Sequence, residues 1–287
     1  MKNLLKIGLL VVAMQPLLLW AGNPDSLQVV KARWHVDSLD GMVLKYCHFD
    51  RNNCMGTNQF VAILELAPQS PRRLAFTHSD VRMPTSMQAL RHKARAAING
   101  SYFDMKEHFP ICYLRIDGHE LGENTPQASD SINRKYYQYG GVSLRNGRPY
   151  FYVPDSNRKA EAQMTDSNIM TAGPMLIRRG KPLPMRADRT FVTQRHNRTA
   201  IATKADGTVL LVTVDGRTKQ SQGLSLPEFQ RLLAYLGCTD ALNLDGGGST
   251  TLYVKGRPHG GLVSHPSDNR RFDYLGERPV SNCIIVK

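Results

Sequence analysis

The residues of this sequence best suited to chemistry lie in a glycine-rich segment near the C-terminus, Ala241 to Val254. Three consecutive glycines, Gly246 to Gly248, separate two apolar, strand-like stretches, and Asp245 and Ser249 flank them. Glycine tolerates positive φ and lets other groups approach the backbone, so three in a row can turn several N–H groups toward one anion. The residue types leave an alternative open, a tight corner between two strands in which Asp245 caps the turn.

A second pair of candidate residues follows the apolar segment 208–214, where the sequence reads Asp215-Gly216-Arg217. A guanidinium at a strand end can hold a phosphate, and a carboxylate two residues away can position a water molecule. The two side chains could equally form a structural ion pair.

A third candidate pair comes with the apolar segment 96–98. Asn99 ends that segment, and Asp104 follows the aromatic residues Tyr102 and Phe103. Strand ends often carry functional groups because a rigid scaffold positions them. The alternative is an Asn-Gly turn that Asp104 caps, and the residue types alone slightly favour it.

The elements that must position these residues are mostly short strands. Alternating apolar and polar residues bounded by turn residues predict strands along most of the chain, and Asn146-Gly147 suits a type I′ hairpin turn. The segments expected to form strands are 28–30, 42–46, 60–66, 96–99, 111–116, 142–144, 150–152, 169–171, 175–177, 200–203, 208–214, 241–244, 251–254 and 282–286.

Two segments have the pattern of helices. Ser225 and Glu228 form a capping box, the apolar residues at 229, 232, 233 and 236 share one face, and Gly237 ends the pattern. We expect this helix to pack on the sheet as scaffold. A shorter helix is predicted over 84–94.

The N-terminus has the layout of a secretory signal peptide over residues 1–21. Lys2 and Lys6 precede a short apolar run that ends at Ala21-Gly22. We therefore expect an exported protein, located in the periplasm, at the cell envelope or outside the cell. A retained membrane anchor is the weaker alternative because the apolar run is short, so no stable membrane insertion is expected once the leader is removed.

The chain is strongly basic. Its 287 residues carry a formal net charge of +13, and without the two lysines of the leader the 35 remaining basic and 24 acidic residues leave +11. The basic residues are spread along the chain, which disfavours a nucleic-acid-binding arm and favours affinity for anionic material such as a phosphorylated glycan. A well-solvated surface without a specific partner is the plain alternative.

Five cysteines lie past the leader, where an oxidising compartment permits disulfides. Cys47 and Cys54 bracket a turn-like stretch at 50–53 and are the pair that we expect to be bonded, while the odd count leaves at least one thiol unpaired or intermolecular. Neither the cysteine spacing nor the nine histidines match a metal site. No cofactor is therefore predicted, although an oxygen-liganded divalent cation stays open.

Six motifs and one helix, in one order along the chain, resemble the phosphodiester glycosidase family. They are Ala97–Asp104, Ala172–Ile177, Arg198–Ile201, Leu211–Arg217, the Ser225 helix, Asn243–Thr250 and Glu277–Asn282. The resemblance thins before residue 84 and across 106–140. It implies an α+β fold with a mixed, largely antiparallel sheet and a few packed helices. The single catalytic domain would consist of a strand-rich part at 22–83 and a catalytic core at 84–287.

The resemblance also implies an active site built from the candidate residues. The implied activity is hydrolysis of a sugar-1-phosphodiester in an envelope or host glycan. Catalytic roles fall to Asp245, Asp215, Arg217 and Arg198. Substrate-binding roles fall to Asn99, Asp104, Thr199, Asn243, Gly246, Gly247, Gly248, Ser249, Thr250 and Glu277.

The chemistry of such a substrate accounts for these residue types. Breaking the C1–O bond of a sugar-1-phosphodiester expels a phosphate monoester, a far better leaving group than a sugar alkoxide, so its protonation matters less than in ordinary glycosidases. Arginines and backbone N–H groups would stabilise the charge on the departing phosphate. One carboxylate would activate water or stabilise the positive sugar carbon, and we expect Asp245 first and Asp215 second in this role.

Two other functions fit the same residues. Asp215 and Asp245 could hold a metal ion that activates water against phosphorus rather than carbon, and chelation would then abolish activity. The fold could also serve as a non-catalytic module that binds anionic glycans, and the variant Asp245→Ala would then keep its affinity.

Overall fold

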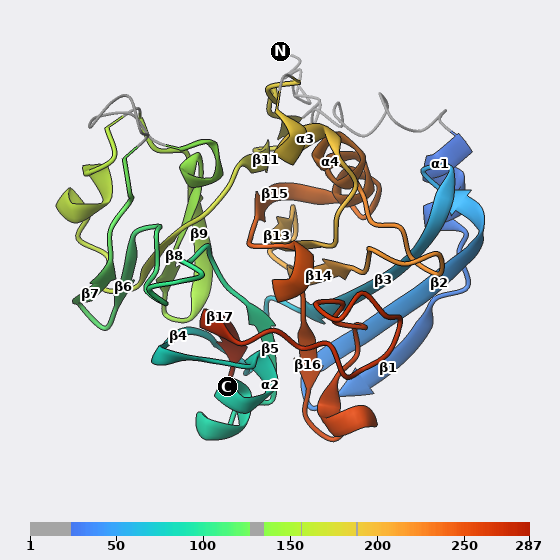
Figure 1. Cartoon of the computed structure of the whole chain (residues 1–287), viewed down its shortest axis with the longest axis horizontal. Coiled ribbons are helices and arrows are strands. Elements are labelled where there is room, and N and C mark those ends of the chain that lie inside the picture. The colour runs from blue at the N-terminus through green and yellow to red at the C-terminus, as the bar shows by residue number, and fades with distance from the viewer. Residues whose placement is uncertain (1–23, 127–134, 156, 188) are drawn as a thin grey trace, which may run out of the picture.

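Three antiparallel sheets and four α-helices make up the described part of the chain (Figure 1). The computed structural model describes residues 24–126, 135–155, 157–187 and 189–287, so the predicted leader at 1–21 lies outside the described residues. All strand pairs within the three sheets are antiparallel. The predicted α+β fold with a largely antiparallel sheet is confirmed.

The largest sheet has eight strands and forms the platform of the molecule. Its order is β1 (His35–Leu39), β2 (Met42–Cys54), β3 (Thr57–Leu66), β14 (Val209–Val214), β13 (Arg198–Lys204), β15 (Cys238–Asn243), β11 (Met175–Arg178) and β12 (Lys181–Pro182). A four-stranded sheet has the order β16 (Leu252–Val254), β5 (Ala96–Asn99), β17 (Val280–Val286) and β4 (Leu74–Met83). A five-stranded sheet has the order β7 (His119–Gly122), β6 (Leu114–Ile116), β10 (Ile169–Thr171), β8 (Gly141–Arg145) and β9 (Arg148–Tyr152).

The eight-stranded sheet is apolar on both faces. On one face, Ile201 and Leu211 join a core shared with strands of the other two sheets. On the opposite face, Ala200 and Ala202 join a second core with α4 (Leu226–Tyr235) and α1 (Pro24–Val30). Successive side chains of a strand point to opposite faces of the sheet. Consecutive residues within β13, and likewise within β14, therefore pack in different cores. We call the face of Ile201 and Leu211 the inner face.

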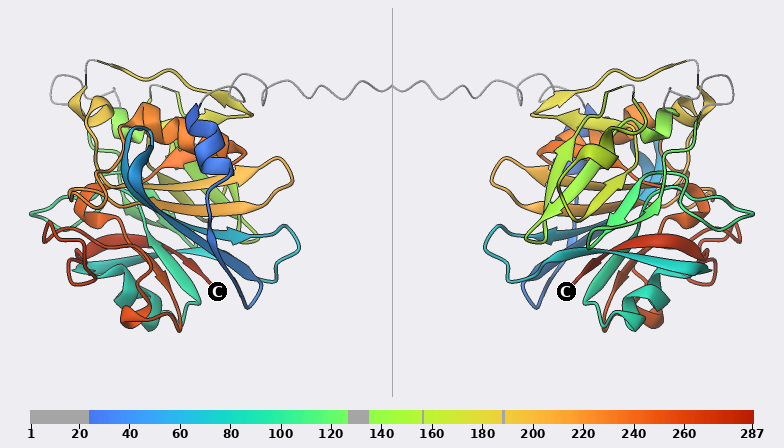
Figure 2. Two further views of the ribbon diagram at one scale, coloured as in Figure 1. Left: turned by 90° about the vertical axis from the view of Figure 1, so that its right-hand side faces the viewer. Right: turned by 90° about the vertical axis from the view of Figure 1, so that its left-hand side faces the viewer.

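Helices cover the outer surfaces of the sheets. The helix α2 (Thr85–Arg91) packs on the four-stranded sheet, where Ala89 and Ile285 belong to a small third core. Figure 2 shows α1 and α4 near one end of the molecule and α2 near the other end. The short helix α3 (Thr190–Thr193) precedes β13. The eight-stranded and four-stranded sheets therefore lie between these helices.

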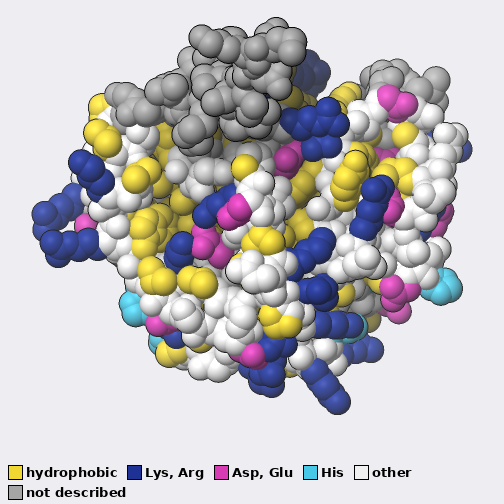
Figure 3. Space-filling model, turned by 180° about the vertical axis from the view of Figure 1, so that it is seen from behind, with side chains coloured by type: hydrophobic (Ala, Val, Ile, Leu, Met, Phe, Trp, Pro, Cys, Tyr) yellow, Lys and Arg dark blue, Asp and Glu magenta, His cyan; other side chains and the backbone are white. Residues whose placement is uncertain are grey.

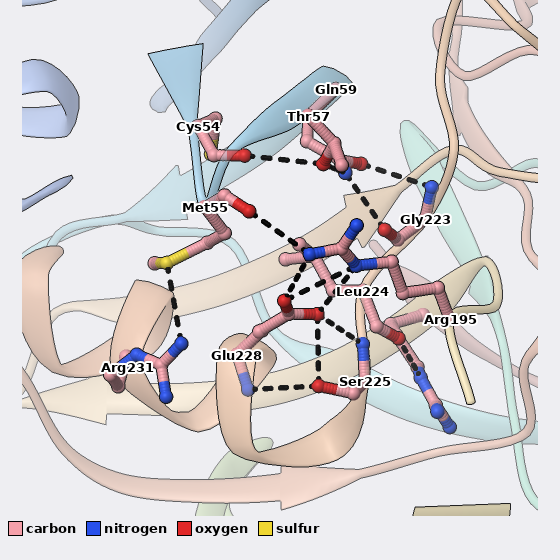
Figure 4. A network of polar contacts seen from close by, with 11 residues as sticks. Cys54, Met55, Thr57, Gln59, Arg195, Gly223, Leu224, Ser225, Glu228 and Arg231 are labelled. Carbon is pink, nitrogen blue, oxygen red and sulfur yellow. Dashed lines mark hydrogen bonds and ion pairs between the residues drawn. The ribbon is translucent and has the colours of Figure 1, made fainter. Parts of the chain in front are cut away.

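The predicted capping box begins α4 (Figure 4). The Ser225 hydroxyl accepts a hydrogen bond from the Glu228 amide at 3.4 Å, and the Glu228 carboxylate accepts one from the Ser225 amide at 2.8 Å. Arg195 adds an ion pair with the same carboxylate at 2.5 Å and donates to the Met55 carbonyl at 3.0 Å. The start of α4 is thus tied to the turn between β2 and β3, and the predicted helix is confirmed.

Two local expectations were wrong. Residues 28–30, expected as a strand, form the end of α1, because a three-residue apolar run is too short for its period to decide between strand and helix. Cys47 and Cys54 do not form a disulfide, and both lie on β2. The turn that they were expected to bracket falls instead at Met55 and Gly56, which both have positive φ.

The surface is basic without a continuous basic patch on the face drawn in Figure 3. Lys and Arg side chains form several small groups there, with Asp and Glu side chains between them. None of the helices in the described ranges is long and apolar enough to cross a bilayer.

Candidate active site

The glycine turn lies where the eight-stranded and four-stranded sheets meet. The chain leaves β15 at Asn243, passes through the turn, and enters β16 at Leu252. Backbone hydrogen bonds fix its start, because the Leu244 amide donates to the Thr199 carbonyl at 2.9 Å and the Asp245 amide to the Gly100 carbonyl at 3.1 Å. One end of the turn is therefore held by both sheets.

Close approach of other groups explains the three glycines. A Cβ atom on Gly246 would lie 2.6 Å from the Asn197 carbonyl oxygen. A Cβ on Gly247, which also has a φ of +59°, would lie 2.7 Å from a guanidinium nitrogen of Arg217. At Gly248 the Cβ would meet the side chains of Asp268 and Arg278. Each glycine thus admits a different neighbour to the backbone.

The glycine amides do not form the predicted anion nest. The Gly246 amide donates to the Asp245 carboxylate at 2.9 Å, and the Gly247 amide donates to the Asn197 carbonyl at 3.0 Å. Two of the three N–H groups are thus already bonded within the protein. The positive charge next to Asp245 comes mainly from the side chains of Arg278 and Arg217.

Asp245 is partly accessible and lies beside two arginines. Burial raises the pKa of its carboxyl to about 6. Four neighbouring groups lower that pKa: the Ser249 hydroxyl, the Arg278 guanidinium, the Gly246 amide and the Arg217 guanidinium. The Ser249 hydroxyl is buried beside the carboxylate without a hydrogen bond of good geometry. Asp245 is therefore a carboxylate that changes protonation near pH 6 next to fixed positive charge.

Arg217 and Arg278, which we call the arginine pair, share one carboxylate. Arg278 donates to Asp268 Oδ1 through Nε at 3.0 Å and through Nη2 at 2.5 Å, and Arg217 Nη1 lies 3.9 Å from the same oxygen. Burial and the nearby Arg278 lower the pKa of Arg217. Guanidinium groups of this kind suit the binding of a phosphate, because each presents several donors in a fixed geometry.

A buried hydrogen-bond network holds the backbone of the glycine turn in place. Asn99 Nδ2 donates to the Asp245 carbonyl at 2.7 Å, while Asn99 Oδ1 accepts from the Thr251 amide and the Thr199 hydroxyl, each at 3.1 Å. Thr199 also lies 3.1 Å from the Thr250 hydroxyl. Asn99, Thr199 and Thr250 were expected to touch substrate, but the structure places all three as buried positioning residues.

Asn243 is likewise buried, at the end of β15. Its Nδ2 lies 2.8 Å from the Tyr102 hydroxyl and donates to the Gly173 carbonyl at 2.9 Å. The Tyr102 hydroxyl in turn lies 3.1 Å from the Leu244 carbonyl. Burial raises the pKa of Tyr102 well above its usual value, so this phenol stays protonated. The pair fixes the backbone directly before Asp245.

The variant Asn99→Ala should lower both stability and activity. It leaves the Asp245 carbonyl and the Thr251 amide without their buried partner, at a cost of about 1–3 kcal/mol in the free energy of unfolding. Hydrolysis should fall as well, because Asp245 loses its support. Denaturant unfolding and initial rates measure the two effects. The matched control is Asn168→Ala, whose amide bonds the exposed Asp117, and equal effects of both variants would contradict the assignment.

Three residues that were predicted for the site make structural hydrogen bonds instead. Arg198 donates to the carbonyls of Leu224, Phe191 and Gln194 at 2.7–3.1 Å, on the face of the sheet opposite to Thr199. Asp104 caps its own loop, accepting from the amides of residues 106 and 107. Glu277 accepts from the Ser86 amide at 2.8 Å and from its hydroxyl at 2.6 Å, and so caps α2.

Asp215 is completely buried at the end of β14. Its Oδ2 accepts two hydrogen bonds of 2.8 Å, from the amide and from Nδ1 of His265. Burial raises the pKa of Asp215, and the contacts with His265 oppose that rise. Asp215 therefore acts on its surroundings through His265.

The sequence reasoning missed several residues that shape the site: Arg278, Asp268, Tyr102, His265 and Asn197. Arg278 and Tyr102 lie inside motifs that carry the family resemblance, so their motifs were the available signal. Asp268 and His265 lie in a loop-rich segment without a local pattern. Over residues 24–126, 135–155, 157–187 and 189–287, no three His, Cys, Asp or Glu side chains gather as a metal site would require.

Comparison with known proteins places these residues in a family. The family model described as phosphodiester glycosidase matches residues 92–287. The chain belongs to the phosphodiester glycosidase family. The glycine turn, Arg217 and Arg278 all fall inside the matched residues, and the enzymes that this family is named for are hydrolases.

Curated relatives match shorter stretches of the chain. The N-acetylglucosamine-1-phosphodiester alpha-N-acetylglucosaminidases of Mus musculus and Homo sapiens are each 39% identical over 97 residues, which is 33% of this chain and 18% of each relative. The SPbeta prophage-derived uncharacterized protein YomE of Bacillus subtilis is 33% identical over 140 residues, or 46% of this chain and 22% of YomE. The chain thus spans about a fifth of the length of these relatives.

Solved structures share the fold over most of the chain. The catalytic domain of zebrafish N-acetylglucosamine-1-phosphodiester alpha-N-acetylglucosaminidase, auto-inhibited by its pro-peptide, superposes with a TM-score of 0.63 at 20% identity, over 88% of this chain and 85% of that domain. A hypothetical protein from Synechocystis gives 0.62 at 19% identity, over 88% and 63%. At these identities the likeness concerns the fold.

Proposed function

We propose that this phosphodiester glycosidase hydrolyses a sugar-1-phosphodiester at the C1–O bond, with Asp245 and the arginine pair as the reacting centre. The observation that carries the proposal is a partly accessible carboxylate, Asp245, next to two guanidinium groups that are also held together by Asp268. Such an arrangement suits a substrate with a sugar carbon that becomes positive and a phosphate that becomes more negative.

The arginine pair would bind the phosphate. A phosphodiester carries one negative charge, and cleavage at C1 leaves the bonding electrons on the phosphate oxygen, so negative charge accumulates there in the transition state. Preorganised donors stabilise such charge more than they stabilise the substrate, which is the requirement for catalysis. Arg217 and Arg278 are held against Gly247 and Gly248 and need little reorganisation.

Asp245 would act on the other side of the broken bond. As a carboxylate it can accept a proton from water while the water oxygen bonds to C1, or it can stabilise the positive sugar carbon. The products are a free sugar with a hydroxyl at C1 and a phosphate monoester. The substrate class, a glycan linked through phosphate, and the lack of any cofactor requirement belong to this proposal.

Hydrolysis in oxygen-18 water tests where the bond breaks. Label on the C1 hydroxyl of the sugar supports the proposal, and label on phosphate supports the metal-dependent phosphodiesterase alternative. A chelator should leave the rate unchanged in the first case and abolish it in the second. A protein that binds the phosphodiester and never turns it over would support the binding-module alternative.

The pH dependence of kcat/KM should have an acid limb near pH 6. Asp245 must be ionised to accept a proton, and its carboxyl has a pKa of about 6. Below that value kcat/KM should fall about tenfold per pH unit. Rates measured from pH 4.5 to 8 check this, and a rate that rises as the pH falls through 6 would show instead that the protonated form is active.

Export belongs to the proposal as well. The charge and the apolar run of residues 1–21 support a cleavable leader, and an exported enzyme would meet envelope or host glycans. Expression of the full chain with an N-terminal sequence determined on the cell-free fraction tests it. A protein that keeps Met1 and stays inside the cell would contradict export.

A further inference from the structure

Four exposed basic residues form a row across one end of the four-stranded sheet, the end that the letter C marks in Figure 1. We call them the basic row: Lys255 directly after β16, Arg95 directly before β5, Lys287 directly after β17 and Arg73 directly before β4. Backbone hydrogen bonds join these strand ends. The Lys255 amide donates to the Arg95 carbonyl at 2.8 Å, and the Arg95 amide donates to the Val286 carbonyl at 2.7 Å. Neighbouring strands lie roughly 5 Å apart, so the row follows a line of roughly 15 Å.

Like charges lie opposite one another in this row. The Lys287 amide donates to the Arg73 carbonyl at 2.9 Å, and the Arg73 amide donates to the backbone oxygen of Lys287 at 3.2 Å. Residues that exchange both hydrogen bonds are directly opposite, and their side chains leave the same face of the sheet. Like charges in this position destabilise a sheet. An anion that lies on the row would remove that repulsion.

Further positive charge lies next to the row at the end of α2. Arg91 and Lys93 are exposed there. Burial lowers the pKa of His92, and the nearby charges of Lys287 and Arg91 lower it further. The positive field of the row therefore extends to the end of α2.

Most of these basic side chains have no acidic partner. Asp40 pairs with Arg95 at 3.3 Å and also with Arg72. Five side chains form no ion pair within 4 Å among the described residues: Arg73, Arg91, Lys93, Lys255 and Lys287. Asp40 and the carboxylate at the end of Lys287 are acidic groups at this end of the sheet, so positive charge stays in excess.

The basic row lies at the end of the sheet away from the candidate active site. β5 has Arg95 before its first residue, and its last residue is Asn99, which supports the glycine turn. β17 likewise has Arg278 shortly before its first residue and Lys287 after its last. At roughly 3.3 Å per residue, the length of β5 separates the two ends by roughly 13 Å. A ligand on the row therefore leaves the active site open.

The residue types favour one kind of ligand. The segments 72–73, 91–95, 255–257 and 287 contain no Phe, Tyr or Trp and no apolar residue larger than Ala94. Single-stranded nucleic acids are bound through stacking of bases on aromatic side chains, and helices that lie on a bilayer insert apolar side chains into it. The row offers neither contact. A line of exposed cations suits a linear polyanion, whose charges it can pair one after another.

We propose that the basic row binds a linear polymer with regularly repeated negative charges, such as a chain of sugar or polyol phosphates. The polymer lies across the ends of β16, β5, β17 and β4 and relieves the repulsion between Arg73 and Lys287. It holds the protein on polyanionic material while the active site at the other end of the sheet stays accessible. The inference goes beyond the proposed function, because binding of the polymer needs no turnover.

Binding of two labelled polymers tests the row: poly(glycerol phosphate), which carries phosphates, and oligogalacturonate, which carries carboxylates. The double variant Lys255→Gln/Lys287→Gln should bind about tenfold more weakly at about 50 mM salt, and its affinity should depend less steeply on salt. The matched control Lys31→Gln/Lys181→Gln loses the same charge at exposed positions of other elements, and it should change the affinity less than about twofold. Binding of one polymer or of both supports the proposal, and one alone identifies the anionic group. Equal losses in the two variants, or no binding by the wild type, would overturn it.

Conservative variants and melting temperatures separate charge from packing. Lys255→Arg/Lys287→Arg keeps both charges and should bind as the wild type does. The glutamine variant should melt no lower than wild type, because it removes like charges from the row. The polymer should raise the melting temperature of the wild type and leave that of the glutamine variant nearly unchanged. Loss of binding in the arginine variant would show that charge does not hold the polymer, and would overturn the proposal.

Other ligands and the proposed function have their own outcomes. Vesicles of phosphatidylglycerol, or oligo(dT), might be bound more tightly than either polymer, with that binding lost in Lys255→Gln/Lys287→Gln. Such a result would assign the row to a lipid surface or to nucleic acid and overturn the polymer. If the wild type hydrolyses no sugar-1-phosphodiester, the proposed function fails, while binding of the polymers still supports the row.

Discussion

Replacing Asp245 by asparagine should lower kcat/KM for a sugar-1-phosphodiester by about 10²–10⁴-fold, because the variant loses the carboxylate that accepts the proton of water. Asparagine has nearly the same shape, and its carbonyl oxygen can still accept the hydrogen bond that the Gly246 amide donates at 2.9 Å. Initial rates of free-sugar release measure the effect. Activity within a factor of about ten of wild type would remove Asp245 from the mechanism.

The thermal stability of the same variant distinguishes lost chemistry from lost fold. Burial raises the pKa of Asp245 from 3.8 to about 6, so the folded protein favours the protonated form. The stability associated with that proton is present below about pH 4 and is lost as the pH rises through 6. Asp245→Asn should therefore melt at the same or a higher temperature than wild type at pH 7.5, with the difference narrowing between pH 6 and 4. A much lower melting temperature at pH 7.5 would attribute the lost activity to misfolding.

Removing Arg278 should lower kcat about 10²–10³-fold with a smaller change in KM. The reason is that the negative charge of the phosphate grows between the bound substrate and the transition state, so a preorganised donor contributes most there. Arg278→Lys should recover part of the loss, since an ammonium supplies charge without the bidentate geometry. Steady-state kinetics on one phosphodiester measure all three proteins.

The pH profile of the Arg278→Ala variant provides a second readout. Arg278 lowers the pKa of Asp245, so its loss should move the acid limb of kcat/KM to higher pH. Arg145→Ala is the matched control, because Arg145 forms an exposed ion pair with Asp166 at 2.8 Å on β8. An unmoved limb, or an equal loss in the control, would show that Arg278 only supports structure.

Elements with strong local signals were predictable from the sequence. The capping box at Ser225 and Glu228 and the period of the following apolar residues gave α4, and Asn146-Gly147 gave the β8–β9 hairpin. The order of strands in the sheets was not predictable, because the pairing of β14 with β3 joins residues about 150 positions apart and leaves no local pattern. The turn-forming residue types at 50–53 predicted a bend there, but the turn lies at Met55 and Gly56.

The candidate site was predictable in part. Asp245, Arg217 and the three glycines come together as expected, since one short segment and one strand end deliver them. Arg198 and Thr199 could not both face the site, because adjacent strand residues point to opposite faces, and only the packed sheet shows that Thr199 points inward. Glu277 caps α2 through Ser86, which lies 191 positions away in the sequence. A contact over that separation leaves no local pattern.

Under the proposed function, the ion pair between Asp268 and Arg278 makes the Asp268 carboxylate an internal competitor for the substrate phosphate. A phosphate that reaches the two guanidinium groups must share them with this carboxylate or push it aside. The resting site is therefore kept in shape without any bound anion, and simple anions gain less there than the two positive charges would suggest.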